Sequence, residues 1–117
     1  MAIVVTALQP YPSGWAINGT SADASGCEEL VAAPATGTSL YLKKIAINVD
    51  AAIDVTIGAG ETSGAVTTVI IGTIGLDANE TFTYEFDRPI KLAAATSLTV
   101  DASGAGVITV VAEGYTE

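Results

Sequence analysis

Hydrophobic side chains alternate with polar ones along most of this chain, and that period of two constrains the fold more than any other feature. In residues 81–86 the aromatic side chains of Phe82, Tyr84 and Phe86 share one side, while two threonines and a glutamate take the other. Such alternation is typical of a β-strand with one buried face, because successive side chains point in opposite directions. Helical spacing occurs nowhere over a useful length, so the sequence predicts an all-β protein.

The alternating runs are short, and glycine, proline and aspartate cluster between them. A chain of 117 residues fits one compact domain. We therefore expect an antiparallel two-sheet β-sandwich, jelly-roll-like, over residues 18–117, with an N-terminal arm over residues 1–17 that can include a first strand. The expected strands lie near residues 2–8, 15–18, 28–32, 40–49, 53–57, 66–74, 81–86, 90–92, 97–101 and 107–115.

One expected strand changes its parity partway along. In residues 40–49 the apolar positions are even-numbered up to Leu42 and odd-numbered from Ile45 onward. The change falls at Lys43 and Lys44. A β-bulge there would return both halves of the strand to the same core face and leave the lysines outward, so the pattern predicts a bulge at this pair.

Residues 66–74 and 107–112 carry apolar side chains on both faces of the expected strands. A two-layer sandwich covers only one face of each sheet with its own partner sheet. The second face then needs the chain's own N-terminal segment, a neighbouring subunit or a host surface. We expect homo-oligomerisation, and the contact residues expected from these strands are Val69, Ile71, Ile108 and Val110.

The N-terminal segment is the second expected contact region. Its direction is set by Pro10 and Pro12, and it lacks the basic start and cleavage site of a secretory signal, so we expect none. The aromatic residues of the segment favour an anchor in an apolar groove over a platform for a sugar ring. The residues expected to dock onto a neighbouring subunit or a shell are Ile3, Val4, Val5, Leu8, Tyr11 and Trp15.

Charge restricts the classes of partner. Thirteen carboxylates and four cations give a formal net charge of −9. Affinity for nucleic acid comes largely from lysine and arginine contacts to phosphate, so we expect no nucleic-acid partner, and an anionic membrane surface is disfavoured for the same reason. No apolar stretch is long enough to span a bilayer. The charge does not exclude a protein as partner.

Catalytic patterns are sparse. The chain has no histidine, its only cysteine is Cys27, and no serine stands beside a base in a hydrolase-like motif, so we expect no enzyme and no cofactor. Loop aspartates such as Asp50, Asp54 and Asp77 offer oxygens to calcium, but without EF-hand spacing, so we expect no metal site. The glycines of residues 58–64 lack the lysine of a phosphate-binding loop and favour a hairpin loop.

Several strand and turn phrases resemble small β-sandwich proteins that decorate tailed-phage particles, the decoration or cement proteins. The phrases are residues 37–45 (GTSLYLKKI), 84–92 (YEFDRPIKL), 96–100 (TSLTV) and the hydrophobic strand at 107–115. In that family a strand opens after a glycine-rich start, a proline follows an aromatic strand, and a hydrophobic strand closes the domain. Other virion sandwiches, such as tail-fibre modules, share these phrases.

The resemblance implies a jelly-roll subunit, often trimeric, on the outside of an expanded head where capsomers meet. It implies the phage major capsid protein as partner, a homotrimer as oligomer, and the capsid surface of the virion as location, after assembly in the host cytoplasm. The alternative is a receptor- or carbohydrate-binding module of a tail fibre or surface assembly. A glycosidase that uses paired carboxylates, such as Glu85 with Asp87, comes third.

Overall fold

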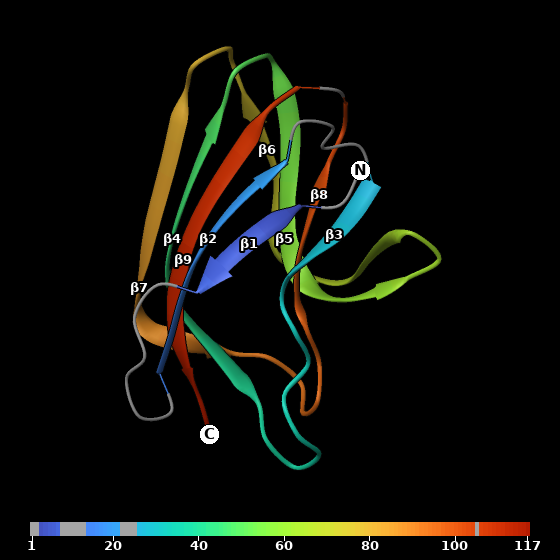
Figure 1. The fold of residues 1–117 in the computed structure, drawn as a ribbon, viewed down its shortest axis with the longest axis vertical. Coiled ribbons are helices and arrows are strands. Elements are labelled where there is room, and N and C mark those ends of the chain that lie inside the picture. The colour runs from blue at the N-terminus through green and yellow to red at the C-terminus, as the bar shows by residue number, and fades with distance from the viewer. Residues whose placement is uncertain (1–2, 8–13, 22–25, 105) are drawn as a thin grey trace.

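The computed structural model describes residues 3–7, 14–21, 26–104 and 106–117, and within these residues it contains β-strands and no helix (Figure 1). The prediction of an all-β fold is confirmed. The strands are β1 (Val4–Ala7), β2 (Gly14–Ser21), β3 (Gly26–Val31), β4 (Leu40–Val49), β5 (Ile53–Thr62), β6 (Ala65–Leu76), β7 (Thr81–Lys91), β8 (Leu98–Ala102) and β9 (Ile108–Thr116). None of the described residues belongs to a helix suited to crossing a membrane.

The strands form two antiparallel sheets, one ordered β1-β2-β9-β4-β7 and the other β3-β8-β5-β6. Their pairing is nested: β2 pairs with β9, β3 with β8, β4 with β7, and β5 with β6. These eight strands are one long antiparallel ribbon that turns at β5–β6 and is rolled into two layers. The pairings of β4 with β9 and of β5 with β8 complete the sheets. This is jelly-roll topology, as the sequence predicted.

The core lies between the two sheets and is built from alternate positions of their strands. In β4 the odd positions Ile45, Ile47 and Val49 are fully buried, and in β5 the odd positions from Ile53 to Ile57 face them across the interior. Burial of each such side chain contributes about 1.5–3 kcal/mol. The aliphatic composition noted in the sequence therefore fills a core that is continuous across both layers.

The predicted bulge at the lysine pair is confirmed. Leu42 pairs with Gly114 of β9 and Lys44 pairs with Glu113, so Lys43 is one extra residue in β4. Leu42 and Ile45 are both buried on the core side, whereas both lysines are exposed. The bulge thus restores the inward face, for the reason that the parity change indicated.

The predicted break at residues 87–89 is wrong, because β7 runs unbroken from Thr81 to Lys91. Glu85 lies opposite Lys44 and Ile90 lies opposite Leu42, so the intervening four residues of β7 face only Lys43. This long bulge accommodates Pro89, which is tolerated because β7 is an edge strand and its outer N–H groups need no ladder partner.

The expected loop at residues 58–64 is also shorter than predicted. β5 continues to Thr62 and β6 begins at Ala65, so the turn contains only Ser63 and Gly64. Both turn residues have positive φ, 53° and 79°, which is the backbone of a type I′ hairpin turn. Gly58 lies inside β5, where an added Cβ would collide with the Val66 side chain and the Thr68 carbonyl oxygen. Close strand approach, and not loop flexibility, explains that glycine.

The N-terminal strands extend the five-stranded sheet. β2 pairs with β9 from Gly14 opposite Tyr115 to Ser21 opposite Ile108, and β1 pairs with β2. β2 therefore crosses the expected boundary between an arm at 1–17 and a sandwich at 18–117. The described part of that arm forms a sheet edge, while the arm residues at 8–13, which include Leu8 and Tyr11, lie outside the described residues.

Candidate binding surfaces

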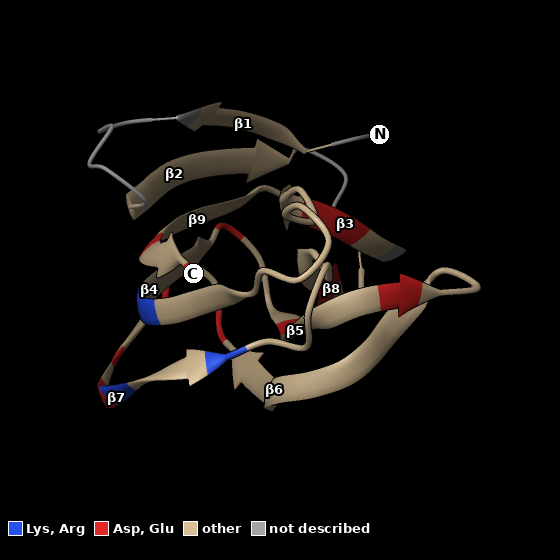
Figure 2. Ribbon diagram, turned by 90° about the horizontal axis from the view of Figure 1, so that it is seen from below, with Lys and Arg blue, Asp and Glu red and all other residues tan. Residues whose placement is uncertain are grey.

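One side of the sandwich is formed by two long edge strands, β6 and β7. β7 ends the five-stranded sheet and β6 ends the four-stranded sheet, and they lie on the same side of the molecule, away from β1 and β2 (Figure 2). Apolar side chains of both strands pack against the core but stay partly exposed. We call this surface the β6–β7 seam, and it consists of Ile70, Ile71, Ile74, Phe82, Tyr84 and Phe86.

Three aromatic rings line the β7 side of the seam. Tyr84 lies opposite Ile45 in β4, and because the Ile45 side chain is in the core, Tyr84 points to the same inward side. The centroid of its ring lies 6.4 Å from that of Phe82 and 4.8 Å from that of Phe86, within the range of favourable aromatic pairs. Tyr84 nevertheless keeps 49% of its surface exposed. The seam therefore presents a row of three aromatic rings, of which the middle one, Tyr84, is only half covered by the chain itself.

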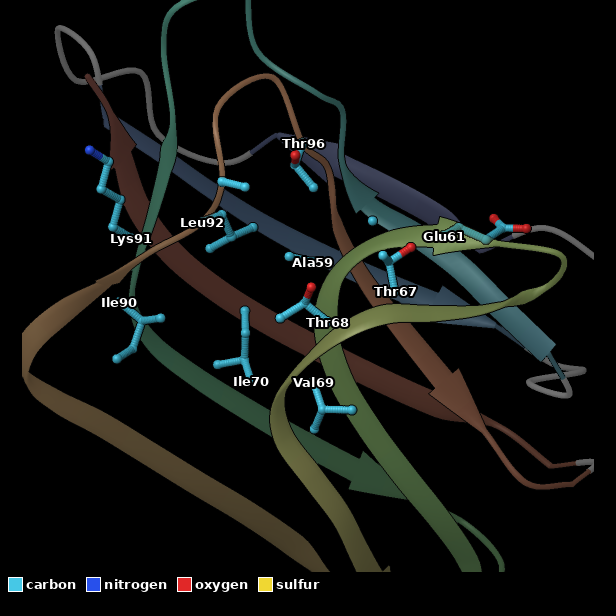
Figure 3. Close-up of a pocket in the computed structure, with 12 residues that line it drawn as sticks. Ala59, Glu61, Thr67, Thr68, Val69, Ile70, Ile90, Lys91, Leu92 and Thr96 are labelled. Carbon is cyan, nitrogen blue, oxygen red and sulfur yellow. The ribbon is translucent and has the colours of Figure 1, made fainter.

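A cavity of about 510 Å³ opens at one end of the seam (Figure 3). Its apolar wall includes Ile70 of β6 and Ile90 of β7, and Glu61 and Lys91 stand at opposite ends of it. This combination of aliphatic surface with a few hydroxyls suits an apolar side chain or a small ligand of mixed polarity. The lining residues are Ala59, Gly60, Glu61, Thr67, Thr68, Val69, Ile70, Ile90, Lys91, Leu92, Ala93 and Thr96.

The expected two-faced apolar pattern in β6 is only partly present. Val69 is 56% exposed and lines the cavity, whereas Ile71 does not face outward as expected but packs against the core and stays partly exposed at the seam. β6 has an extra residue at two places relative to β5, because Ile74, Ile71 and Val69 oppose Val55, Ile57 and Gly58 in turn. Each bulge reverses the parity, which turns Ile71 inward.

The prediction of contact residues in β9 chose the wrong face. Ile108 and Val110 are 1% and 0% exposed, because they lie opposite the core residues Val49 and Ile47 of β4. The outward residue of the same strand is Val111, which is 42% exposed. Alternation identified two faces in this segment correctly, but it did not say which face the other sheet covers.

The described N-terminal residues serve the chain's own packing. Ile3, Val5 and Trp15 are partly buried against the core cluster, and of the described residues expected to dock only Val4 is exposed. The Trp15 ring lies over Gly114, where an added Cβ would come within 2.6 Å of the ring. Trp15 is therefore a packing residue and not an open sugar platform. The structure does not bring these residues together with Val69, since β1 and β6 lie on opposite sides of the molecule (Figure 2).

Charge is distributed unevenly between the two sheets (Figure 2). All four cations of the chain lie on β4 and β7, neighbours in the five-stranded sheet. The described strands of the four-stranded sheet contain only carboxylates among their charged residues, namely Glu28, Glu29, Asp54, Glu61 and Asp101. The net charge of −9 is therefore distributed unevenly: the five-stranded sheet carries all the cations, and the charged residues in the described strands of the four-stranded sheet are all carboxylates.

Cys27 of β3 has a thiol whose pKa is affected by its burial and by the carboxylates of the four-stranded sheet. Its thiol is half-buried and free, so it does not belong to a disulfide. Burial raises the pKa of the Cys27 thiol above its ordinary value, a hydrogen bond with Thr99 lowers it in part, and the charges of Glu61, Asp101 and Glu28 raise it further. A raised pKa disfavours the thiolate, so Cys27 is not an activated nucleophile.

Among the described residues, no group of three or more histidine, cysteine, aspartate or glutamate side chains is placed to hold a metal ion. Asp50 has a structural contact instead, because the backbone N–H of Val107 donates a 2.7 Å hydrogen bond to its Oδ1 atom. That bond ties the β4–β5 turn to the start of β9.

No family model matches the chain, and no curated protein matches it. Among solved structures, the coat protein of tobacco streak virus is similar to it with a TM-score of 0.31 and 12% sequence identity, over 92% of this chain and 90% of that chain. A TM-score at this level does not establish a common family.

Proposed function

We propose that this chain is a structural subunit of a virus particle: a decoration, or cement, protein that binds the outer surface of a tailed-phage head. The observation that carries the proposal is the β6–β7 seam. A jelly roll that leaves Tyr84 half exposed beside two further aromatic rings has a surface suited to a protein partner, because tyrosine and other aromatics dominate the binding energy of protein interfaces.

The proposed partner is the major capsid protein, and the proposed location is the capsid surface of the virion. A subunit that binds only the assembled shell stabilises it by mass action, and many copies bound across neighbouring capsomers add avidity. This role requires a folded domain with an adhesive surface and no chemical step. The homotrimer implied by the family resemblance is part of the same proposal.

The structure changes which residues we propose as the anchor. Ile3, Val5 and Trp15 pack against the chain's own core, so they are not free to hold a partner without loss of that packing. Val69 and Tyr84, by contrast, are about half exposed on the seam side. We therefore assign the contact with the shell to the seam.

The test is binding of seam variants to heads of the virus that encodes the chain, by co-sedimentation and cryo-electron microscopy. Val69→Asp combined with Tyr84→Asp places one carboxylate in the cavity at the end of the seam and one on the seam itself, and should weaken binding about tenfold or more. Val111→Asp is the control, because Val111 is a similarly exposed valine on the outer face of β9, outside the seam. Unchanged binding by the seam variant, or a loss confined to the control, would refute the assignment.

A receptor- or carbohydrate-binding module is the second candidate, and the 510 Å³ cavity favours it. The cavity volume lies in the range of small-ligand sites, and its wall offers the hydroxyls of Thr67, Thr68 and Thr96 beside the Glu61 carboxylate. Binding on a glycan array that disappears in Glu61→Gln or Thr68→Val, with head binding absent in the wild type, would favour this function over decoration.

A further inference from the structure

The four cations of the chain gather around one structural feature, the bulge between β4 and β7. Lys43 is the extra residue of β4, Lys44 borders it, and Arg88 lies in the β7 segment that loops out opposite Lys43. Lys91 follows, paired with Tyr41. All four side chains are exposed. We call this group, Lys43, Lys44, Arg88 and Lys91, the basic corner.

Part of this charge is compensated within the chain. Lys44 lies between Glu113 of β9 and Glu85 of β7 in the cross-strand register, where opposite charges attract. Lys43 and Arg88 instead lie in the bulged segments, outside the regular ladder. They are the cations best placed to meet a carboxylate on another molecule.

The opposite charge gathers on the far sheet, at the edge formed by β3. Glu29 is exposed on β3, and Asp101 of the neighbouring β8 lies opposite Cys27. Glu61 completes the group, because its charge and that of Asp101 both act on the Cys27 thiol. We call Glu29, Glu61 and Asp101 the acidic patch. Figure 2 shows the two surfaces on different strands and different sheets.

We propose that the basic corner of one copy of this chain binds the acidic patch of a second copy. Charge complementarity supports this choice of partner, because the chain carries both a surface that holds all its cations and a surface that holds only anions. Each surface includes part of an edge strand, with Arg88 and Lys91 on β7 and Glu29 on β3. Because the bulge interrupts the regular hydrogen-bonding pattern of β7, we expect the contact to use side-chain charges and not strand pairing.

The positions of the basic corner and the acidic patch determine which type of symmetry a contact between two copies can have. A two-fold contact pairs residue i of one copy with residue j of the other, and j with i, within one shared patch, so it would need the basic corner and the acidic patch side by side; the two groups lie on different sheets instead (Figure 2). The contact between basic corner and acidic patch is heterologous, so it leads to a closed ring or an open row of subunits. It goes beyond the proposed binding to a shell, because it joins copies of the chain to each other and uses residues outside the seam.

The experiment measures self-association by sedimentation velocity of the purified chain, without heads, so its outcome is independent of the proposed function. We expect wild-type assemblies in low salt that dissociate in about 0.5 M NaCl, since exposed charge contacts are screened. Two variants carry the test: Lys43→Glu with Arg88→Glu, and Glu29→Lys with Asp101→Lys. Each alone should self-associate about tenfold or more weakly than the wild type.

An equimolar mixture of the two variants is the decisive sample. Its mean net charge equals the wild-type value of −9, and each variant then offers the charge that the other lacks, so association should return. The matched control is Asp77→Lys with Glu117→Lys, which makes the same change of net charge at exposed sites outside the acidic patch and should not mimic its loss. Circular dichroism confirms that each variant is folded.

Three outcomes would overturn the proposal. They are a wild type that is monomeric at about 100 μM in low salt, folded variants that associate as the wild type does, and a mixture in which association does not return. The last would indicate that the variants act through net charge or through a different contact.

Discussion

The two sides of the sandwich use hydrophobic side chains in different ways. On the N-terminal side, the chain adds β1 and β2 to the five-stranded sheet and so buries Ile17 and most of Trp15. On the seam side, β6 and β7 are the last strands of their sheets, and Tyr84 stays half exposed. Apolar residues with similar local patterns therefore stabilise the fold on one side of the molecule and stay exposed on the other.

The largest difference is expected from a carboxylate placed on each side. Ile17 is 5% exposed, so Ile17→Asp buries a charge and should lower the free energy of unfolding by about 4 kcal/mol or more. Val69→Asp on the seam side should change it by no more than about 0.5 kcal/mol. Urea denaturation of both variants measures the difference. Equal losses would show that Val69 is as integral to the fold as Ile17.

Truncation of one aromatic residue on each side gives the next largest effect. Trp15→Ala removes a ring packed on Gly114 and the core and should cost about 3 kcal/mol of stability. Tyr84→Ala removes a half-exposed ring that touches its neighbours on one strand and should cost about 1 kcal/mol. Thermal unfolding followed by circular dichroism checks both values, and a costlier Tyr84→Ala would mean that the seam is closed in the free protein.

Alternation in the sequence predicted the layers of this fold well, because the direction of a side chain along a strand is a local property. The bulge at Lys43 was predictable for the same reason: the parity changes at two adjacent lysines that must face water. Pro89 led to the wrong prediction of a break, because a proline ends a central strand but is tolerated in a bulged edge strand. Whether a strand lies at the edge depends on the whole topology, which the sequence pattern does not show.

The binding surfaces were less predictable, because they depend on which strands end the sheets. Ile108 and Val111 are alike in the sequence, and only the pairing of β9 between β2 and β4 decides which one is inside. Ile71 was misassigned because two bulges in β6 shift its direction. The seam brings residues of β6 and β7 together because both strands end their sheets on the same side, which the sequence does not show. The alternation of Phe82, Tyr84 and Phe86 was the one feature of the seam that the sequence did show.

The smallest predicted effect concerns Cys27, which lies on the edge of the four-stranded sheet distant from β7. Because burial and nearby carboxylates raise the pKa of its thiol in the folded state, the thiolate forms at higher pH there than in the unfolded chain. The pH midpoint for alkylation by iodoacetamide should therefore be higher in buffer than in denaturant. The same shift makes a small contribution to stability that is present below the unfolded-state pKa and is lost as pH rises through the folded-state pKa.

A midpoint for Cys27 that is equal in the two conditions would contradict the burial of the thiol and the effect of the carboxylates near it. Glu61→Gln provides the matched control, because removal of that charge should lower the folded-state midpoint without a change in the denatured one.

We propose that the seam between β6 and β7 is open in the free protein and covered in the particle. Hydrogen–deuterium exchange on free and particle-bound protein tests this most directly. We expect amides in residues 65–76 and 81–91 to gain protection on binding, while those in residues 4–7 and 14–21 exchange as before. Protection gained only in the N-terminal strands, with the seam unchanged, would contradict it.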